Sequence, residues 1–384
     1  MRFIGGNDIK LLRSGLEYFP ALELAIHNAK TEIYLQVYIY EYDSAGMRIG
    51  NALMQAAQRG VTVNVLLDGF GSQYLPKRYV KTLRDAGIKL MFYRPKISPW
   101  TFKTNRLRRL HSKVAVIDGE IAFVGGINII DDTNTPSQVP PRIDYAVSIE
   151  GNLLPVISAS FQKLWRRLEW MHLHSLYIPP GKKVMHWPHQ RNGMKAAYVI
   201  RDNIMHRRDI ENAYLHAIQT AQSEILIANA YFIPGRKFRK AMIDAAQRGV
   251  KVRLLLQGRK EYFLMFATHA FYNEFLDNGI EIYEYRKSFM HSKVAVIDDD
   301  WATVGSSNID PFSLLLSREA NIIIQDQAFT AELHAELESL IHDGGLSITP
   351  QVWIKASIVK RFASWVAYGM VRFFLGVIGY AKEK

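Results

Sequence analysis

Hydrophobic and polar positions follow the same succession of patterns twice along the chain. Short apolar, β-branched runs predict buried strands at 31–40, 61–67, 88–93 and 113–117, and again at 223–232, 250–256, 280–285 and 293–297. Stretches with helical periodicity predict amphipathic helices at about 45–58 and 75–86, and again at about 235–248 and 265–278. This alternation predicts an α/β fold in which each half is a mixed β-sheet flanked by helices.

The two halves also share sequence, block by block. "AAQRGVTVNVLLDG" at 56–69 corresponds to "AAQRGVKVRLLLQG" at 245–258, and "HSKVAVIDG" at 111–119 returns as "HSKVAVIDD" at 291–299. Because the blocks keep their order, we predict a duplicated domain. The expected divisions are a first domain at 1–175, a linker at 176–196, a second domain at 197–345 and a C-terminal tail at 346–384.

Composition narrows the possible functions. With 384 residues, of which 48% are hydrophobic, the chain is long enough for two folded domains. It has no cysteine, which excludes disulfides, thiolate nucleophiles and cysteine-ligated metals. A formal net charge of +12 favours a polyanionic partner, either nucleic acid or an anionic membrane surface. The first residues hold no apolar run long enough for a signal peptide, so secretion is not expected.

The repeated motif has the pattern H-x-K-x4-D. Positions i and i+2 of a strand face the same side, so His111 points with Lys113 and His291 points with Lys293. Lysine has no lone pair to offer and repels a metal ion, so no metal site is expected. An imidazole beside an ammonium group favours a phosphate.

Polar residues after each motif extend this anion site. "GGIN" and "GSSN" provide Asn128 and Asn308 as donors, with Ser306 or Ser307 as a hydroxyl. Asp144 and Glu319 follow in comparable strands, where a carboxylate can orient a histidine. Asp118 and Asp298 complete the motifs, although at a strand end they can instead hold a turn or a cation.

The paired motifs resemble the HKD signatures of the phospholipase D superfamily, over about residues 8–340. Segments 38–46, 66–72, 108–128 and 229–235 are similar to bacterial cardiolipin synthases of the short type, which lack two N-terminal membrane helices. The resemblance implies two pseudo-twofold-related domains with both motifs in one site between them, and no metal or other cofactor. It implies phosphatidyl transfer between two phosphatidylglycerol molecules, giving cardiolipin and glycerol through a phosphohistidine.

By the same resemblance His111 is the nucleophile and His291 the general acid and base. The catalytic residues expected from the motifs are His111, Lys113, Asp118, His291, Lys293 and Asp298. The resemblance further implies that Asn128, Asn308 and Ser306 bind phosphate and that Asp144 and Glu319 orient the histidines.

Two further segments suggest contact with lipid. Arg108 and Arg109 end a basic, aromatic stretch before the first motif and are expected to contact a head group. The tail reads as a basic amphipathic helix in which Trp353, Phe362 and Trp365 are expected to contact the membrane. A tail packed on the protein's own core and a short membrane-dipping hairpin are the alternatives. We expect a peripheral or monotopic protein on the cytoplasmic face of a bacterial inner membrane, and no oligomeric state is predicted.

Other functions fit parts of the same pattern. A phospholipase D-type hydrolase or transphosphatidylase would use the same histidines with water or another alcohol as acceptor. A phosphodiesterase nuclease of the same fold would suit the basic, aromatic segment. Nucleic acid is nevertheless the disfavoured partner, because nuclease members are often small, single-motif chains that dimerise. A silent scaffold is disfavoured because both motifs are intact.

Overall fold

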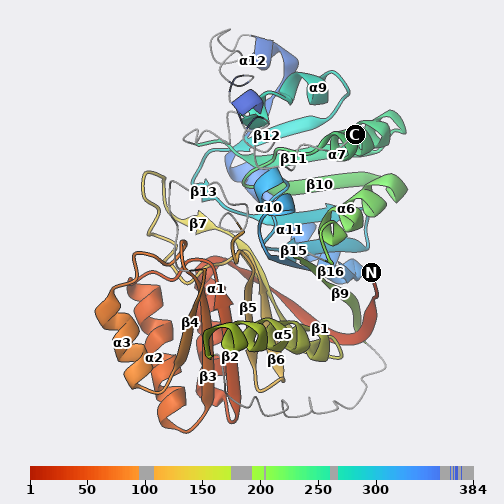
Figure 1. Ribbon diagram of the computed structural model, residues 1–384. Coiled ribbons are helices and arrows are strands. Elements are labelled where there is room, and N and C mark those ends of the chain that lie inside the picture. The colour runs from red at the N-terminus through yellow and green to blue at the C-terminus, as the bar shows by residue number, and fades with distance from the viewer. Residues whose placement is uncertain are drawn as a thin grey trace.

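The protein consists of two similar α/β halves, which lie one above the other in Figure 1. The computed structural model describes residues 1–94, 108–173, 193–202, 205–259 and 267–354, together with 364, 366, 368–370 and 373. Within these residues no helix is both long enough and apolar enough to cross a membrane.

The first half follows the predicted alternation. Its elements are β1 (Ile4–Arg13), α1 (Ser14–Asn28), β2 (Glu32–Val37), α2 (Ser44–Gln58), β3 (Thr62–Asp68), α3 (Lys77–Asp85), β4 (Lys89–Tyr93), β5 (Lys113–Ile117), β6 (Ile121–Gly125), β7 (Arg142–Ile143), β8 (Tyr145–Gly151) and α5 (Leu154–Leu173). Helix α2 ends just before Gly60, whose φ of +91° favours glycine.

The second half repeats this order. Its elements are β9 (Met194–Arg201), α6 (Asp209–Thr220), β10 (Glu224–Asn229), α7 (Arg236–Gln247), β11 (Lys251–Gln257), α9 (Tyr272–Leu276), β12 (Glu281–Tyr285), β13 (Phe289–Met290), β14 (Lys293–Ile297), β15 (Trp301–Gly305), α10 (Pro311–Leu315), β16 (Glu319–Gln325), α11 (Gln327–Gly344), β17 (Gly345–Ile348) and α12 (Pro350–Ile354).

The two halves share one sheet, whereas the sequence predicts a separate sheet for each. The strand order is β17-β12-β11-β10-β14-β15-β16-β9-β1-β8-β6-β5-β2-β3-β4. The order reads the same outward from the β1–β9 pair in both directions, apart from the extra edge strand β17. Antiparallel pairing of Ile4 with Ala196 and of Asn7 with Met194 makes this central junction. The junction therefore lies close to a pseudo-twofold axis that relates the halves.

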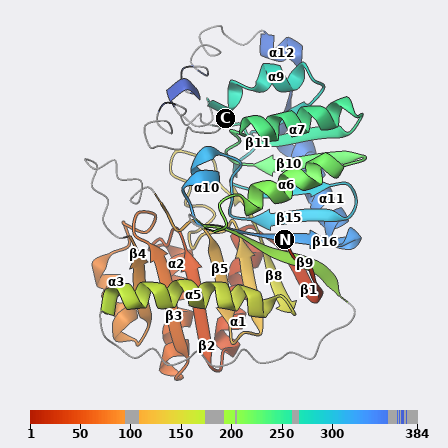
Figure 2. The same ribbon diagram turned by 45° about the vertical axis from the view of Figure 1, so that its right-hand side comes forward.

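Helices cover both faces of the first-half strands. Buried residues of α1 and α2, such as Leu22, Ile49 and Leu53, pack against one face. On the other face α5 runs across the strands, as Figure 2 shows, and buries Phe161 and Trp165. The strands between these helices are consequently buried on both faces, which explains their continuous apolar runs.

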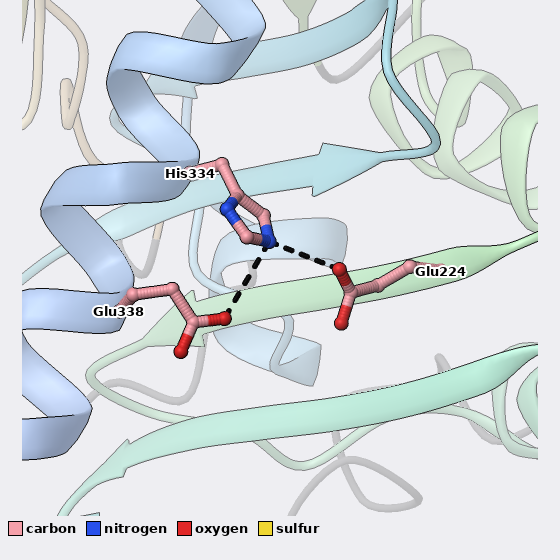
Figure 3. Close-up of side chains that lie close together, drawn as sticks. All are labelled: Glu224, His334 and Glu338. Atoms are coloured by element: carbon pink, nitrogen blue, oxygen red, sulfur yellow. Dashed lines mark hydrogen bonds and ion pairs between the residues drawn. The ribbon is translucent and has the colours of Figure 1, made fainter.

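Helix α11 ties the two halves together. Its Phe329, Leu333 and Leu337 are buried in a core to which strands of both halves contribute. Ion pairs attach α11 to β10 and β11, and Figure 3 draws three of the residues involved. In this network Nε2 of His334 lies 2.9 Å from Oε2 of Glu224.

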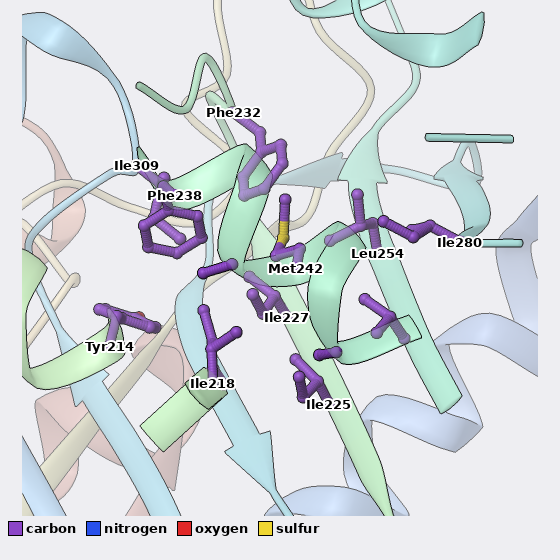
Figure 4. Close-up of a cluster of buried hydrophobic side chains, with 14 of the residues drawn as sticks. Tyr214, Ile218, Ile225, Ile227, Phe232, Phe238, Met242, Leu254, Ile280 and Ile309 are labelled. Atoms are coloured by element: carbon purple, nitrogen blue, oxygen red, sulfur yellow. The ribbon is translucent and has the colours of Figure 1, made fainter. Parts of the chain in front are cut away.

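The second half has a core of its own beneath α6 and α7. Figure 4 shows Phe238 and Met242 of α7 directed at Ile227 of β10 and Leu254 of β11. Phe238 and Met242 are four residues apart, the spacing that places two side chains on the same face of a helix.

Three boundaries differ from those predicted. The last residues of the predicted linker, 194–196, belong to β9, and the first residues of the predicted tail belong to β17, which pairs with β12. Both strands are held by long-range pairing that local sequence does not reveal. Within the helix predicted at about 265–278, residues 267–269 and Tyr272–Leu276 (α9) are helical, a turn separates them, and 265–266 lie outside the described residues.

Candidate active site

Both motif histidines stand at the same edge of their half of the sheet. His111 precedes β5 and His291 precedes β14, and these strands run antiparallel to β2 and β10. The histidines therefore lie where the parallel strands end, which is the edge at which open α/β sheets place their ligands.

The backbone of each histidine is held by the opposite half. The amides of His111 and Ser112 donate to the carbonyl of Arg318 at 2.9 and 2.8 Å. The amide of His291 donates to the carbonyl of Ile143 at 2.7 Å, beside the pairing of β13 with β7. These crossed contacts bring the two motifs to the junction of the halves.

The predicted orienting carboxylates are in contact with the histidines. Nδ1 of His111 lies 2.9 and 3.0 Å from the two carboxylate oxygens of Glu319. Nδ1 of His291 lies 2.7 Å from Oδ2 of Asp144. Each carboxylate thus comes from the half that does not supply the histidine. An Nδ1–H donated to a carboxylate leaves the lone pair on Nε2, the nitrogen that can attack or carry a proton.

Two buried ammonium groups share this junction. Nζ of Lys113 donates to the carbonyl of His111 at 2.5 Å, and Nζ of Lys293 lies 3.4 Å from Oδ2 of Asp144. Burial lowers the pKa of Lys113 to about 7 and that of Lys293 to about 8. The carboxylates of Glu319 and Asp144 oppose these shifts without cancelling them. The charge of Lys293 also lowers the pKa of Lys113, so both motifs share one electrostatic environment.

Burial also favours the neutral form of both imidazoles. Burial and then the charge of Lys293 lower the pKa of His291 to about 3, although Asp144 acts in the opposite direction. Burial, reinforced by Lys113, lowers the pKa of His111. Burial alone would raise the pKa of Asp144, but Lys293 and His291 hold it below its usual range. At pH 7 the charged carboxylate of Asp144 therefore faces a predominantly neutral imidazole of His291.

The two motif asparagines are buried beside the histidine strands. Oδ1 of Asn128 accepts a hydrogen bond from the amide of Ile39 at 3.0 Å. Oδ1 of Asn308 has no hydrogen-bond partner among the residues that the structure describes. A buried polar atom without a partner is rare, so the Asn308 amide marks a place for a polar ligand group.

The prediction that Ser306 binds phosphate is wrong. Its hydroxyl donates to Oε2 of Glu319 at 2.6 Å and accepts from the amide of Ala320 at 3.0 Å. The first half has Gly126 at this place, where a Cβ would come within 2.2 Å of Oδ1 of Asp144. Ser306 consequently supports a carboxylate instead of contacting a substrate.

Asp118 and Asp298 are corrected from catalytic to structural residues. The Asp118 carboxylate accepts from the amides of 30–32 at distances between 2.7 and 2.9 Å. The Asp298 carboxylate accepts from the amides of 222–224 at distances between 2.8 and 3.2 Å. An extended strand of this length separates Asp118 from His111 by roughly 20 Å. These aspartates hold the turn before the first parallel strand of each half.

Two side chains that the sequence analysis missed hold the residue before each histidine. Oδ2 of Asp68 accepts from the amide of Leu110 at 2.8 Å. Oε1 of Gln257 accepts from the amide of Met290 at 2.9 Å. The sequence does contain a sign of this role. Asp68 and Gln257 occupy equivalent positions, at the ends of the repeated blocks "VNVLLD" and "VRLLLQ".

The residues predicted to contact lipid differ in where the structure places them. The guanidinium of Arg109 lies 5.5 Å from the ring of Phe70 and 3.7 Å from Oδ1 of Asp68, beside the first histidine. Arg108 is half-buried next to it. Phe362 and Trp365 lie outside the described residues.

Trp353 is corrected from a membrane contact to a core residue. It is 5% exposed, and its ring lies 4.9 Å from that of Tyr272 and 5.5 Å from that of His269. The aromatic pattern of the tail begins here, but tertiary packing on α9 removes Trp353 from the surface.

One further group of ionisable side chains has the composition of a metal site. Glu224, His334 and Glu338 bring their ligand atoms close together, as drawn in Figure 3. Nη2 of Arg253 lies 2.6 Å from Oε1 of Glu224 and also contacts Oε1 of Glu338. The guanidinium already balances both carboxylates, so a cation would have to displace it. We therefore interpret the group as an ion-pair network.

A duplicated α/β fold that gathers two histidine–lysine pairs where its halves meet defines the phospholipase D class of phosphodiester-exchange enzymes. The protein family described as "Cardiolipin synthase, PLD-like domain" matches residues 22–138 and 214–341. Cardiolipin synthase B of Shigella flexneri is 37% identical over 387 residues, which cover 98% of this chain and 90% of that protein. Within the class, the chain belongs to the cardiolipin synthase family with PLD-like domains.

Solved structures share the fold at much lower identity. Phosphatidylserine synthase of Haemophilus influenzae Rd KW20 has a TM-score of 0.71 at 14% identity, covering 99% of this chain and 96% of that one. Polyphosphate kinase from Porphyromonas gingivalis has a TM-score of 0.58 at 16% identity, covering 97% of this chain and 53% of that one. These likenesses concern the fold alone.

Proposed function

We propose that the protein is a cardiolipin synthase, which transfers the phosphatidyl group of one phosphatidylglycerol to a second and releases glycerol. The main supporting observation is that each histidine contacts a carboxylate of the opposite half, His111 with Glu319 and His291 with Asp144. Two buried lysine ammonium groups lie beside these contacts. A phosphodiester exchange through a covalent intermediate needs two such imidazoles in opposite roles. Membership of the family supports the choice of lipid substrate.

The reaction has two steps. In the first, Nε2 of one imidazole attacks phosphorus, the N–P bond forms and the P–O bond to glycerol breaks. The other imidazole, which enters this step protonated on both nitrogens, gives its Nε2 proton to the departing oxygen and becomes neutral. In the second step that imidazole takes the proton of the acceptor hydroxyl, whose oxygen attacks phosphorus and releases the histidine. Lys113, Lys293, Asn128 and Asn308 stabilise the charge on the non-bridging oxygens.

The order of the histidines follows the family resemblance, with His111 as nucleophile and His291 as general acid and base. One observation favours the reverse order: a pKa of about 3 makes the protonated form of His291 costly. Rapid quenching of a turnover with phosphorus-labelled phosphatidylglycerol, followed by peptide mapping, distinguishes the two. Label on the peptide that contains His291 would reverse our assignment.

We further propose that the protein works as a peripheral or monotopic protein at the cytoplasmic face of a bacterial inner membrane. The net charge of +12 suits an anionic lipid surface. Val366, Met370 and Phe373 of the predicted amphipathic tail are 42%, 50% and 73% exposed. Their exposure supports a tail that contacts lipid.

The direct test is incubation of the purified protein with phosphatidylglycerol in detergent micelles, with lipid products identified by mass spectrometry. We expect cardiolipin and glycerol in equal amounts. His111→Ala and His291→Ala are each expected to abolish turnover, whereas His216→Ala, an exposed histidine of α6, is expected to retain it. Full activity in either motif variant would refute the two-histidine mechanism.

The products of the same assay separate the related activities. Phosphatidic acid without cardiolipin would make the protein a hydrolase. A phosphatidyl ester formed only with an added alcohol would make it a transphosphatidylase. In both outcomes the two histidines would keep their roles, and water or the added alcohol would replace phosphatidylglycerol as the acceptor.

A further inference from the structure

Three exposed aromatic residues border the first half of the site. Tyr42, Phe70 and Tyr74 are 50%, 41% and 77% exposed. Tyr42 lies between β2 and α2, and the other two lie between β3 and α3. We call these three residues the aromatic rim.

The topology places the aromatic rim beside His111. Strands β2 and β3 are parallel, so the segments that follow them leave the sheet at one edge. Strand β5 runs antiparallel to β2, so the histidine before it lies at that same edge. Contacts agree with this placement, because the ring of Tyr38 lies 4.8 Å from that of His111 and the Arg109 guanidinium lies over Phe70.

The backbone beneath the aromatic rim is firmly held. The hydroxyl of Ser72 donates to the carbonyl of Tyr38 at 3.0 Å and accepts from the amide of Tyr40 at 3.0 Å. Oδ1 of Asp68 accepts from the amides of Phe70 and Gly71 at 2.9 and 3.0 Å. The exposure of the aromatic rings is therefore fixed by the fold and does not come from a loose loop.

Cations stand next to the aromatic rim. Lys77 and Arg78 are exposed in the first turn of α3, three and four residues after Tyr74. Aromatic rings beside cations suit the interface of an anionic bilayer, where the rings enter the head-group region and the cations meet the lipid phosphates. A nearby protein surface would have to supply both apolar area and negative charge.

Tyr368, one of the described residues of the tail, packs against the second half. Tyr368 packs on Phe271 with ring centroids 4.8 Å apart. Phe271 stands in the segment between β11 and β12, as Tyr74 stands between β3 and β4. The strand order places β3 and β11 on opposite sides of the β1–β9 junction. Tyr74 and the Tyr368–Phe271 contact therefore belong to segments on opposite sides of that junction.

We propose that the aromatic rim docks on an anionic lipid bilayer, with the tail as a second contact, so that the site between them faces the membrane. The inference rests on the proposed lipid substrate and adds the surface through which that substrate is reached. Two separated contacts also hold a protein on a membrane more firmly than either alone.

The test compares the full-length protein with its Tyr42→Ser/Tyr74→Ser variant on vesicles of phosphatidylglycerol and phosphatidylcholine. Phe70 is left in place because it contacts Arg109. We expect the double variant to bind the vesicles about tenfold more weakly than wild type in a co-sedimentation assay. The reason is that less apolar side-chain surface enters the membrane interface. Turnover of a water-soluble, short-chain phosphatidylglycerol below its micelle concentration is expected to stay unchanged. Leu24→Ser, 62% exposed on α1 near the opposite edge, is the matched control and should bind like wild type.

Each outcome is informative. Unchanged vesicle binding in the double variant would overturn the proposal. A change in oligomeric state by light scattering, with unchanged vesicle binding, would make the aromatic rim a protein interface. If no variant makes cardiolipin, the proposed function fails, while the binding comparison still decides the role of the aromatic rim.

Discussion

Lys113 and Lys293 make the charge of the site depend on pH near neutrality. Burial lowers their pKa values to about 7 and about 8, and a lysine carries its charge only below its pKa. Phosphate binding should therefore weaken as the pH rises through this window. We predict that kcat/KM, measured with short-chain phosphatidylglycerol, falls as the pH rises through about 7 to 8.

Arginine variants provide the control for this prediction. The guanidinium of Lys293→Arg stays protonated at every pH that the protein survives. Its activity is expected to be lower, because a guanidinium is larger than an ammonium group, but its alkaline fall should move to higher pH. If kcat/KM falls at the same alkaline pH in both Lys113→Arg and Lys293→Arg as in wild type, another group is responsible for the fall.

At the residue scale, the sequence predicts which residues are reactive better than it predicts which side chains they contact. The histidines, lysines and carboxylates were identified from a motif whose residue types suit a phosphate. That Glu319 binds His111 across the halves follows from the assembled fold, since spacing along the chain does not record which half supplies a contact. Ser306 and Trp353 were misassigned for the same reason: a nearby carboxylate holds one and a helix covers the other.

At the element scale, Arg253 is the anchor of α11. Its guanidinium is 5% exposed and bridges Glu224 of β10 to Glu338 of α11. We predict that Arg253→Met lowers the free energy of unfolding by about 2 kcal/mol, because it removes the closest cation of two partly buried carboxylates. Chemical denaturation measures the change.

Lys251→Met is the matched control for this prediction. Its ammonium is 54% exposed and 3.9 Å from Oε1 of the same Glu224. Removing this exposed pair should change the unfolding free energy by less than about 1 kcal/mol. Equal losses in the two variants would mean that burial of the arginine contributes nothing.

Elements with strong periodicity were predictable, and those defined by long-range pairing were not. The strands Lys113–Ile117 and Lys293–Ile297 agree with the prediction residue for residue. Strands β9 and β17 fell in stretches interpreted as linker and tail, because their partners lie far away in the sequence. Prolines, glycines and charges around them gave the stronger local signal.

At the scale of the whole molecule, one chain supplies a complete site. The halves share a sheet through β1 and β9, and each histidine has its carboxylate in the opposite half of the same chain. A single chain therefore holds both imidazoles without a second copy. This arrangement makes the chemistry independent of whether copies of the protein associate.

Mixing two inactive proteins tests this independence. We predict that purified His111→Ala and His291→Ala, combined in equal amounts with phosphatidylglycerol micelles, form no more cardiolipin than either alone. The reason is that each chain of the mixture keeps one defective imidazole in the site between its two halves. Gel filtration and thermal melting before mixing would confirm that both variants are folded. Recovery of activity would mean that copies exchange halves across the β1–β9 junction, and the site would then belong to a dimer.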